Sequence, residues 1–221
     1  MTIADRIATI RQQLPDSVQL IAVTKQVPTD AIREAYDAGI RDFGESKIQE
    51  TAEKQSQLQD LPDINWHLIG HLQTNKAAKA VEQFQWIHSV DNLKLATRLD
   101  RLAGELSFSP QVCLQVKILP DPDKYGWNIP ELLADLPELN RCQYIKIQGL
   151  MTIPPRGLDD SQLLEFFNST RELADKIQQQ NLPHISMQQL SMGMSGDYHL
   201  AIQSGATMIR LGTTIFGSRI G

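Results

Sequence analysis

The chain has 221 residues, a mass of 24.8 kDa and 41% hydrophobic residues, which is enough to bury a full core as one domain spanning residues 1–221. Its formal net charge of -5 and pI near 5.5, with no segment rich in Lys and Arg, exclude a general nucleic-acid binder. No apolar run approaches the roughly 20 residues of a membrane span, and the N-terminus has the pattern of a helix start rather than a signal peptide. We expect a cytoplasmic protein whose two cysteines, Cys113 and Cys142, are buried free thiols in a reducing compartment, with no metal site.

Short apolar runs alternate with amphipathic segments along the chain, a pattern typical of β/α proteins. A helix over Ile3–Gln13, closed by Pro15, comes first. Eight strands are then expected, in chain order, at Gln19–Thr24, Gly39–Phe43, Asn65–Ile69, Gln85–Ser89, Gln111–Lys117, Ile145–Leu150, His184–Leu190 and Ala206–Leu211.

Helices are expected between the strands, with Thr29, Asn92 and Asp159 as N-terminal caps. Their expected ranges are Thr29–Ala38, Glu45–Leu58, Ala77–Glu82, Asn92–Glu105, Pro130–Leu136, Asp159–Gln180 and Tyr198–Gln203. Eight strands separated by helices predict a single-domain α/β fold, a (β/α)8 TIM barrel with an extra N-terminal helix. A doubly wound open sheet is the alternative, but the glycine-rich turn that it needs is missing after the first strand, at Thr24–Pro28.

Two strand-like segments, Gln189–Asp197 and Thr207–Gly217, each run into a glycine-containing turn. Glycine lets the backbone approach an anion, and backbone N–H groups and hydroxyls donate hydrogen bonds to it. In a β/α barrel, the loops after the seventh and eighth strands are where phosphate groups usually bind. The sequence therefore predicts a phosphate site at the C-terminal end of this chain.

Lys25 directly follows the first expected strand and shares a face with Ile21 and Val23. If that face points into the barrel, desolvation lowers the pKa of the ammonium group and makes the amine nucleophilic enough to form a Schiff base. The alternative is that the side chain reaches solvent. Pyridoxal 5'-phosphate (PLP) combines an aldehyde for a lysine with a phosphate for a glycine turn, and barrel closure would bring these two ends of the chain together.

Arg210 lies two residues before Gly212, on the face of Met208 in the last expected strand. An arginine that donates to a pyridine nitrogen keeps this nitrogen unprotonated, which limits carbanion chemistry. The alternatives are a structural ion pair in the barrel mouth or direct binding of the phosphate.

Other polar and aromatic residues indicate structural roles. Ser195 is not in a nucleophile elbow, because the G-x-S-x-G spacing fails, and we interpret it as a helix cap. His67 and His71 lie on a strand and its following loop, so we expect a satisfied core histidine at His67 rather than a metal pair. Trp127 is expected either to cover the pocket or to anchor a loop.

The chain also resembles a known family in motifs that occur in order along its whole length. The motifs are Ile21-Ala-Val-Thr-Lys25, Phe43-Gly-Glu45, Trp66–Gln73, Ser89-Val-Asp91, Gly149-Leu-Met151, Leu190–Ser195 with Asp197, and Arg210-Leu-Gly-Thr213. Together they resemble the YggS/PROSC family of pyridoxal phosphate homeostasis proteins. The resemblance implies the barrel of alanine racemase as the fold and PLP as the cofactor, held as an aldimine on Lys25 with Arg210 facing the pyridine nitrogen.

The resemblance also implies the remaining cofactor-binding residues. The residues around the phosphate would be Ser191, Gly193, Gly212 and Thr213, and Met151 would be a further cofactor-binding position. The family usually continues Gly-Glu with Asn-Tyr, whereas Ser46 and Lys47 follow Glu45 here. The contact expected from that asparagine therefore falls to Ser46.

Members of the family are generally single-domain proteins without established catalysis. We expect no counterpart, after the eighth strand, of the β domain that supplies a second acid/base group in alanine racemase. We expect a non-catalytic monomer that stores, buffers or delivers PLP and so affects amino-acid and keto-acid balance. Its partners would be PLP and PLP-dependent apo-enzymes, and neither nucleic acid nor membrane. The alternatives are a slow racemase or transaminase with Lys25 as sole base, and a phosphometabolite enzyme without PLP.

Overall fold

Eight parallel strands close into a TIM barrel in the computed structural model, which describes residues 1–217. They are β1 (Gln19–Val23), β2 (Asp42–Glu45), β3 (Asn65–Leu68), β4 (Trp86–Val90), β5 (Gln111–Lys117), β7 (Lys146–Met151), β8 (Ile185–Met194) and β9 (Met208–Leu211). Each pairs with the next in this order, and β9 pairs back onto β1, beginning with Gln19 opposite Met208. A two-residue strand, β6 (Trp127–Asn128), pairs with β5 outside this ring.

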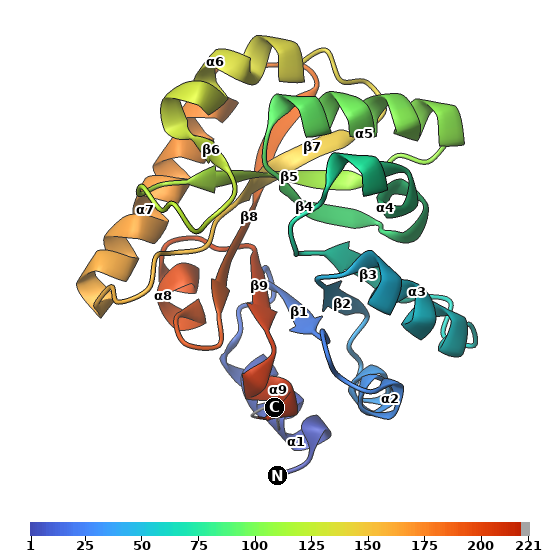
Figure 1. Ribbon diagram of the computed structural model, residues 1–221. Helices are drawn as coiled ribbons and strands as arrows, with labels where there is room; N and C mark the ends of the chain where they lie inside the picture. The colour runs from blue at the N-terminus through green and yellow to red at the C-terminus, as the bar shows by residue number, and fades with distance from the viewer. Residues whose placement is uncertain (218–221) are drawn as a thin grey trace.

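The helices form an outer layer around the barrel (Figure 1). They are α1 (Ile3–Gln13), α2 (Thr29–Asp37), α3 (Ile48–Gln57), α4 (Ala77–Gln83), α5 (Leu93–Leu106), α6 (Ile129–Leu139), α7 (Asp160–Gln178), α8 (Tyr198–Gln203), α9 (Thr213–Phe216) and the 3-10 turn η1 (Thr74–Lys76). The first and last helices lie together, since Arg6 Nη1 of α1 donates to the carbonyl oxygen of Ile215 in α9 at 3.0 Å.

Alternation along the strands separates an outer core from an inner one. On β1, Leu20 and Ala22 belong to the large apolar core that packs against the helices. Ile21 instead belongs to a small cluster inside the barrel. The other buried members of this inner cluster are Trp86, Cys113, Met151 and Met208. The outer core carries most of the hydrophobic stabilisation, because full burial of one Leu, Ile or Phe contributes about 1.5–3 kcal/mol.

The predicted barrel is confirmed, but some element boundaries were wrong. The strand expected at 39–43 is β2 at Asp42–Glu45, because Gly39 has a φ of 90° and belongs to the turn after α2. Glu45 ends this strand, so the helix expected to begin there begins at Ile48. β8 extends to Met194, four residues beyond its expected end at Leu190, and β6 was not predicted.

Two of the three expected helix caps are confirmed. Asn92 Oδ1 accepts from the N–H of Leu95, and Asp159 Oδ1 from the N–H of Gln162, both at 2.9 Å. The cap expected at Thr29 is wrong. Pro28 occupies the N-cap of α2 without a side-chain hydrogen bond, and the Thr29 hydroxyl donates to Gln57 of α3 instead.

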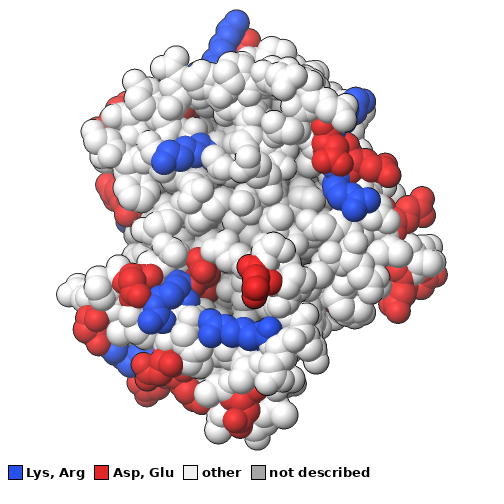
Figure 2. Space-filling model, turned by 180° about the vertical axis from the view of Figure 1, so that it is seen from behind, with Lys and Arg blue, Asp and Glu red and all other residues white. Residues whose placement is uncertain are grey.

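Both cysteines are buried free thiols, as expected, and burial raises the pKa of Cys113 and of Cys142 to about 12. On the face seen in Figure 2, acidic and basic side chains are interspersed, without an extended basic stripe. Within residues 1–217, no helix combines the length and the apolar character that a membrane crossing requires.

Candidate functional site

A cavity of about 490 Å³ opens at the carboxyl ends of the barrel strands. Its volume is in the range typical of small-molecule sites. Its wall combines apolar side chains with the polar groups of Lys25, Ser46 and Arg210. The complete lining comprises Val23, Lys25, Ser46, Ile69, Ile153, Met194, Ser195, Gly196, Arg210, Gly212 and Thr213.

Lys25 enters the cavity from the end of β1 and is half-buried. Alternation places it on the inward face with Ile21 and Val23, as the sequence predicts, and Val23 also lines the cavity. The structure therefore favours a lysine that lines the cavity over the alternative in which the side chain leaves for solvent.

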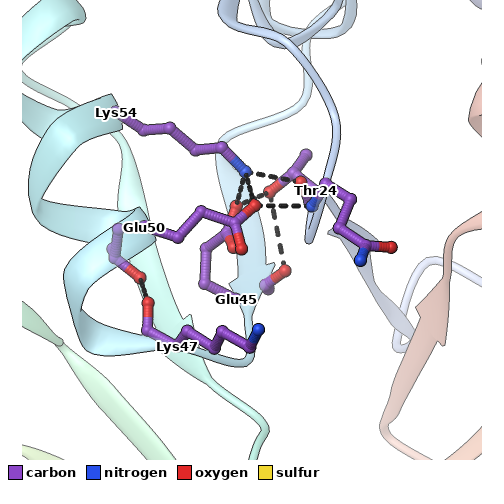
Figure 3. A network of polar contacts seen from close by, with 8 residues as sticks. Thr24, Glu45, Lys47, Glu50 and Lys54 are labelled. Atoms are coloured by element: carbon purple, nitrogen blue, oxygen red, sulfur yellow. Dashed lines mark hydrogen bonds and ion pairs between the residues drawn. The ribbon is translucent and has the colours of Figure 1, made fainter.

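A charged cluster, made of Glu45, Glu50 and Lys54, lies beside Thr24, the residue before Lys25 (Figure 3). Lys54 Nζ contacts both carboxylates at 2.7 Å and donates to the backbone carbonyl of Thr24, also at 2.7 Å. The Thr24 hydroxyl donates to Glu45 Oε1 at 2.7 Å. The peptide group before Lys25 is thus held through a buried cation.

The residue after Lys25 is held by the same charged cluster. Gln26 has a φ of 60°, in the left-handed region that is unfavourable for residues other than glycine. Its N–H donates to Glu50 Oε1 at 2.5 Å. Because Thr24 and Gln26 are both fixed, the backbone of Lys25 has a defined direction toward the cavity.

The two carboxylates of the charged cluster differ in their pKa shifts. Burial raises the pKa of Glu45, whose side chain is 0% exposed and whose Oε2 is unpartnered among the described residues. Partial burial acts in the same direction on Glu50, but hydrogen bonds from Lys54 and Gln26 outweigh it and hold the pKa of Glu50 below its ordinary value. The cluster thus has a solvent-facing carboxylate and an enclosed one.

Arg210 reaches the cavity from β9, opposite Ile21 of β1 in the sheet register. Its guanidinium donates to Ser191 Oγ at 2.7 Å and to the carbonyl oxygen of Thr152 at 3.0 Å. Burial lowers the pKa of Arg210 to about 10, so it remains a cation at neutral pH. Among the described residues it forms no ion pair, which removes the structural ion pair as an explanation for it.

The loops after β8 and β9 form the opposite part of the wall, with Ser195 and Gly196 from one and Gly212 and Thr213 from the other. Ser195 Oγ accepts from the N–H of Thr214, in the first turn of α9, at 3.4 Å. Ser195 therefore joins the two loops rather than capping α8, the helix that follows it, whose N-cap is Asp197. Backbone amides and hydroxyls of this kind are suited to an anionic group.

Five of the eight predicted cofactor-binding residues line this cavity: Lys25, Ser46, Arg210, Gly212 and Thr213. Ser191 lies behind Arg210, and Met151 lies in the inner apolar cluster. Gly193 has a φ of 93°, and a Cβ there would lie 2.7 Å from Ala201 Cβ, so this glycine faces α8. The structure does not bring these three to the cavity wall, and their assignment to cofactor binding stays a prediction.

Sequence reasoning did not assign six residues of the wall to cofactor binding: Val23, Ile69, Ile153, Met194, Ser195 and Gly196. Met194, Ser195 and Gly196 lie in the predicted glycine-containing segment Gln189–Asp197, so this segment was a usable signal. Ile69 and Ile153 follow β3 and β7, and only the closed barrel shows that these strand ends face the same space.

His67, His71 and Trp127 do not line the cavity and form hydrogen bonds elsewhere in the fold. His67 is a satisfied core histidine, as expected, with hydrogen bonds to Asp42 and His88. His71 contacts Asp91 instead, so the two histidines share no ligand. Trp127 Nε1 donates to Asp135 of α6 at 2.8 Å, which identifies Trp127 as a loop anchor.

Comparison with known proteins adds independent findings. The family described as "Alanine racemase, N-terminal domain" matches residues 1–220. A "Pyridoxal phosphate homeostasis protein" of Synechocystis sp. is 54% identical over 207 residues, covering 94% of each chain. One of the same name from Escherichia coli (strain K12) is 39% identical over 216 residues, covering 93% of this chain and 87% of the relative.

Solved structures agree with these matches. PipY of Synechococcus elongatus PCC7942, in a structure with PLP bound, is 55% identical with a TM-score of 0.94 and covers 98% of this chain and 100% of that one. An alanine racemase of Clostridium difficile 630 is 16% identical with a TM-score of 0.77, and the match covers 100% of this chain and 60% of that one. The latter likeness concerns the fold alone.

Proposed function

The chain belongs to the family of pyridoxal phosphate homeostasis proteins, and on this premise we propose that it binds PLP in the cavity at the carboxyl ends of its strands. The observation that carries the proposal is that Lys25 and Arg210, from opposite ends of the chain, meet in one cavity beside the loops after β8 and β9. Residues 1–221 would act as one unit in storing, buffering or delivering this cofactor within the cytoplasm.

The residues of the cavity fit the chemistry of PLP. The Lys25 amine is suited to a covalent Schiff-base bond with the aldehyde carbon, and Arg210 supplies N–H donors for the ring nitrogen. Ser195, Gly196, Gly212 and Thr213 offer hydroxyls and backbone amides for the phosphate, with Ser46 beside Lys25. When bound, PLP acts as an electron sink for carbanions, and an arginine at its ring nitrogen makes it a weak one.

A non-catalytic role is the second part of the proposal. Among the described residues that line the cavity, Lys25 and Arg210 are the ionisable side chains. Racemisation needs a proton donor on the face opposite the base, and neither the guanidinium nor the apolar wall supplies one. We propose a monomer that exchanges PLP with solution or with PLP-dependent apo-enzymes.

Borohydride reduction of the PLP-loaded protein, followed by peptide mass mapping, tests the covalent bond. The pyridoxyl group is expected on Lys25, and Lys25→Ala should abolish the labelling and the visible absorption band. Lys47→Ala is the matched control, because Lys47 follows Ser46 at the cavity edge and should not change either signal. Labelling of Lys47 or Lys76 in place of Lys25 would overturn the assignment.

A second experiment separates carrier from enzyme. The loaded protein is incubated with L-amino acids in deuterated water, and the α-proton is followed by NMR while cofactor transfer to an apo-enzyme is assayed. We expect negligible exchange together with transfer. Rapid, complete exchange on one amino acid would show a racemase or transaminase, whereas failure to reactivate any apo-enzyme would leave buffering as the role.

A further inference from the structure

A continuous chain of hydrogen bonds crosses the barrel interior and ends on Arg210. His67 Nε2 lies 3.0 Å from Asp42 Oδ1, and His67 Nδ1 lies 2.9 Å from His88 Nε2. His88 Nδ1 in turn lies 2.7 Å from Ser191 Oγ, which accepts from Arg210 Nη1 at 2.7 Å. The two histidines and Ser191 are 0% exposed. We call Asp42, His67, His88 and Ser191 the buried relay.

The surroundings of the two histidines keep them neutral. Burial lowers the pKa of His67, although Asp42 opposes this, and it lowers the pKa of His88 further, with the positive charge of Arg210 acting in the same direction. Partial burial disfavours the ionised form of Asp42, but the hydrogen bond from His67 outweighs it and holds the pKa of Asp42 below its ordinary value. The relay thus has one carboxylate and two neutral imidazoles.

These charge states allow one arrangement of protons. An ionised Asp42 can only accept, so His67 carries its proton on Nε2 and its Nδ1 is an acceptor. His88 must then donate from Nε2, which leaves its Nδ1 to accept the hydroxyl proton of Ser191. With its proton directed at His88, Ser191 presents oxygen lone pairs to Arg210. All four hydrogen bonds therefore run in one direction, from Arg210 to Asp42.

This arrangement fixes the guanidinium of Arg210. Its two terminal nitrogens donate to Ser191 Oγ and to the Thr152 carbonyl oxygen. The planar guanidinium cannot rotate without breaking both hydrogen bonds. Buried polar side chains such as His67, His88 and Ser191 are costly in the barrel interior unless they are fully hydrogen-bonded. A core that only needed to be filled could use apolar residues such as the neighbouring Met151 and Cys113.

We propose that His88 and His67 are positioning residues that orient the Ser191 hydroxyl toward Arg210, and thereby hold the guanidinium in the direction in which it meets the ring of bound PLP. The part of this inference that concerns PLP rests on the proposed function. The proton arrangement of the buried relay does not depend on it.

The first test uses the ligand-free protein. Long-range ¹⁵N–¹H correlation spectra of the histidine side chains report which ring nitrogen carries the proton. His67 and His88 are both expected as neutral Nε2–H tautomers at neutral pH, and Ser191→Ala should disturb the His88 signals while Ser191→Thr, which keeps the hydroxyl, restores them. A protonated His88, or a proton on its Nδ1, would overturn the relay.

The second test uses protein loaded with PLP that is ¹⁵N-labelled at the ring nitrogen. His88→Leu should shift the ring-nitrogen resonance and weaken PLP retention by roughly tenfold or more. His88→Asn, whose amide oxygen can still accept from Ser191, should restore part of both. Cys113→Ala is the matched control, since it removes an inner-core side chain outside the relay. Unchanged resonance and retention in His88→Leu would refute the positioning role.

The outcomes separate the two proposals. If the unaltered protein fails to bind PLP while its histidines have the expected tautomers, the proposed function fails and the relay stands. If it binds PLP but the tautomers differ, the relay alone is wrong. If His88→Leu does not fold, Ser191→Ala against Ser191→Thr provides the same comparison with a smaller change in volume.

Discussion

Lys25 and Arg210 are held in place by two supports, the charged cluster and the buried relay, which differ in their chemistry. The charged cluster of Glu45, Glu50 and Lys54 holds the backbone around Lys25 with ion pairs. The buried relay holds Arg210 with neutral imidazoles and a hydroxyl, and its carboxylate lies at the far end. The charged cluster lies at the barrel rim, where Glu50 is 23% exposed, whereas the middle of the relay is fully enclosed.

The degree of burial decides whether ion pairs or neutral hydrogen bonds hold each of the two residues. The charged cluster keeps contact with water through Glu50, which limits the desolvation cost of several kcal/mol per buried ion. Inside the barrel a second charge beside Arg210 would need the same compensation, and neutral donors and acceptors avoid it. Charged side chains thus hold the backbone on both sides of Lys25. Neutral hydrogen-bonding groups hold the side chain of Arg210.

Replacing Lys54 should have the largest effect. Lys54→Met leaves the buried Glu45 carboxylate without its cation, and breaking a buried pair in this way costs about 3–5 kcal/mol. Urea unfolding of the ligand-free protein measures the loss. The double variant Glu45→Gln/Lys54→Met should recover part of it, and equal losses in the single and double variants would contradict the contrast.

Thr24→Val should have an intermediate effect. It removes the hydrogen bond from the Thr24 hydroxyl to Glu45, and a buried hydrogen bond to a charged group contributes about 1.5–3 kcal/mol. Thr24→Ser keeps the hydroxyl and serves as control in the same unfolding experiment. A valine variant as stable as the serine variant would show that this hydrogen bond does not support the strand end.

Acid should weaken the relay through Asp42. The pKa of Asp42 lies below the ordinary value of 3.8, so the ionised carboxylate stabilises the fold above that value, and the contribution is lost as the pH falls through the folded-state pKa. Asp42→Asn cannot titrate and should therefore lose less stability than the unaltered protein between about pH 5 and pH 2. Urea midpoints at several pH values measure this, with the exposed Glu82→Gln as control. Parallel pH profiles would argue against it.

Replacing Arg210 should have the smallest effect on stability and a large one on binding. Arg210→Met removes a buried cation that has no ion-pair partner among the described residues, so relief from desolvation offsets the lost hydrogen bonds to within about 1 kcal/mol. PLP retention should nevertheless fall by roughly tenfold or more, measured by dialysis of the loaded protein. A loss of stability as large as that of Lys54→Met would show that both supports serve the fold alike.

Much of the barrel was predictable because hydrophobic alternation reports strands directly. Eight apolar runs predicted eight strands, and period-two alternation placed Lys25 and Arg210 on inward faces. The resemblance added Ser46, which no pattern singled out. The start of β2 was missed because Ile40 is apolar and buried in the turn after α2, so an apolar run alone could not separate turn from strand.

The two supports could not be predicted because they depend on how elements pack. Lys54 reaches Thr24 only because α3 lies against β1 and β2, a contact between residues 30 positions apart. His88 and Ser191 are 103 positions apart and meet only across the closed barrel. In the sequence, Lys54 is one of several polar residues on a helix, and His88 is one of two polar residues in β4.

The pairing of β9 with β1 sets when the site can form during synthesis. The ribosome makes Arg210 about 185 residues after Lys25. At roughly 5–20 residues per second, translation separates them by about 10–40 seconds. Until the barrel closes, β1 has an unpaired edge that can associate with other chains. During the same interval the amine of Lys25 is not enclosed by the cavity that would select its ligand. The pairing of β9 with β1 therefore covers the exposed strand edge and completes the binding cavity in the same step.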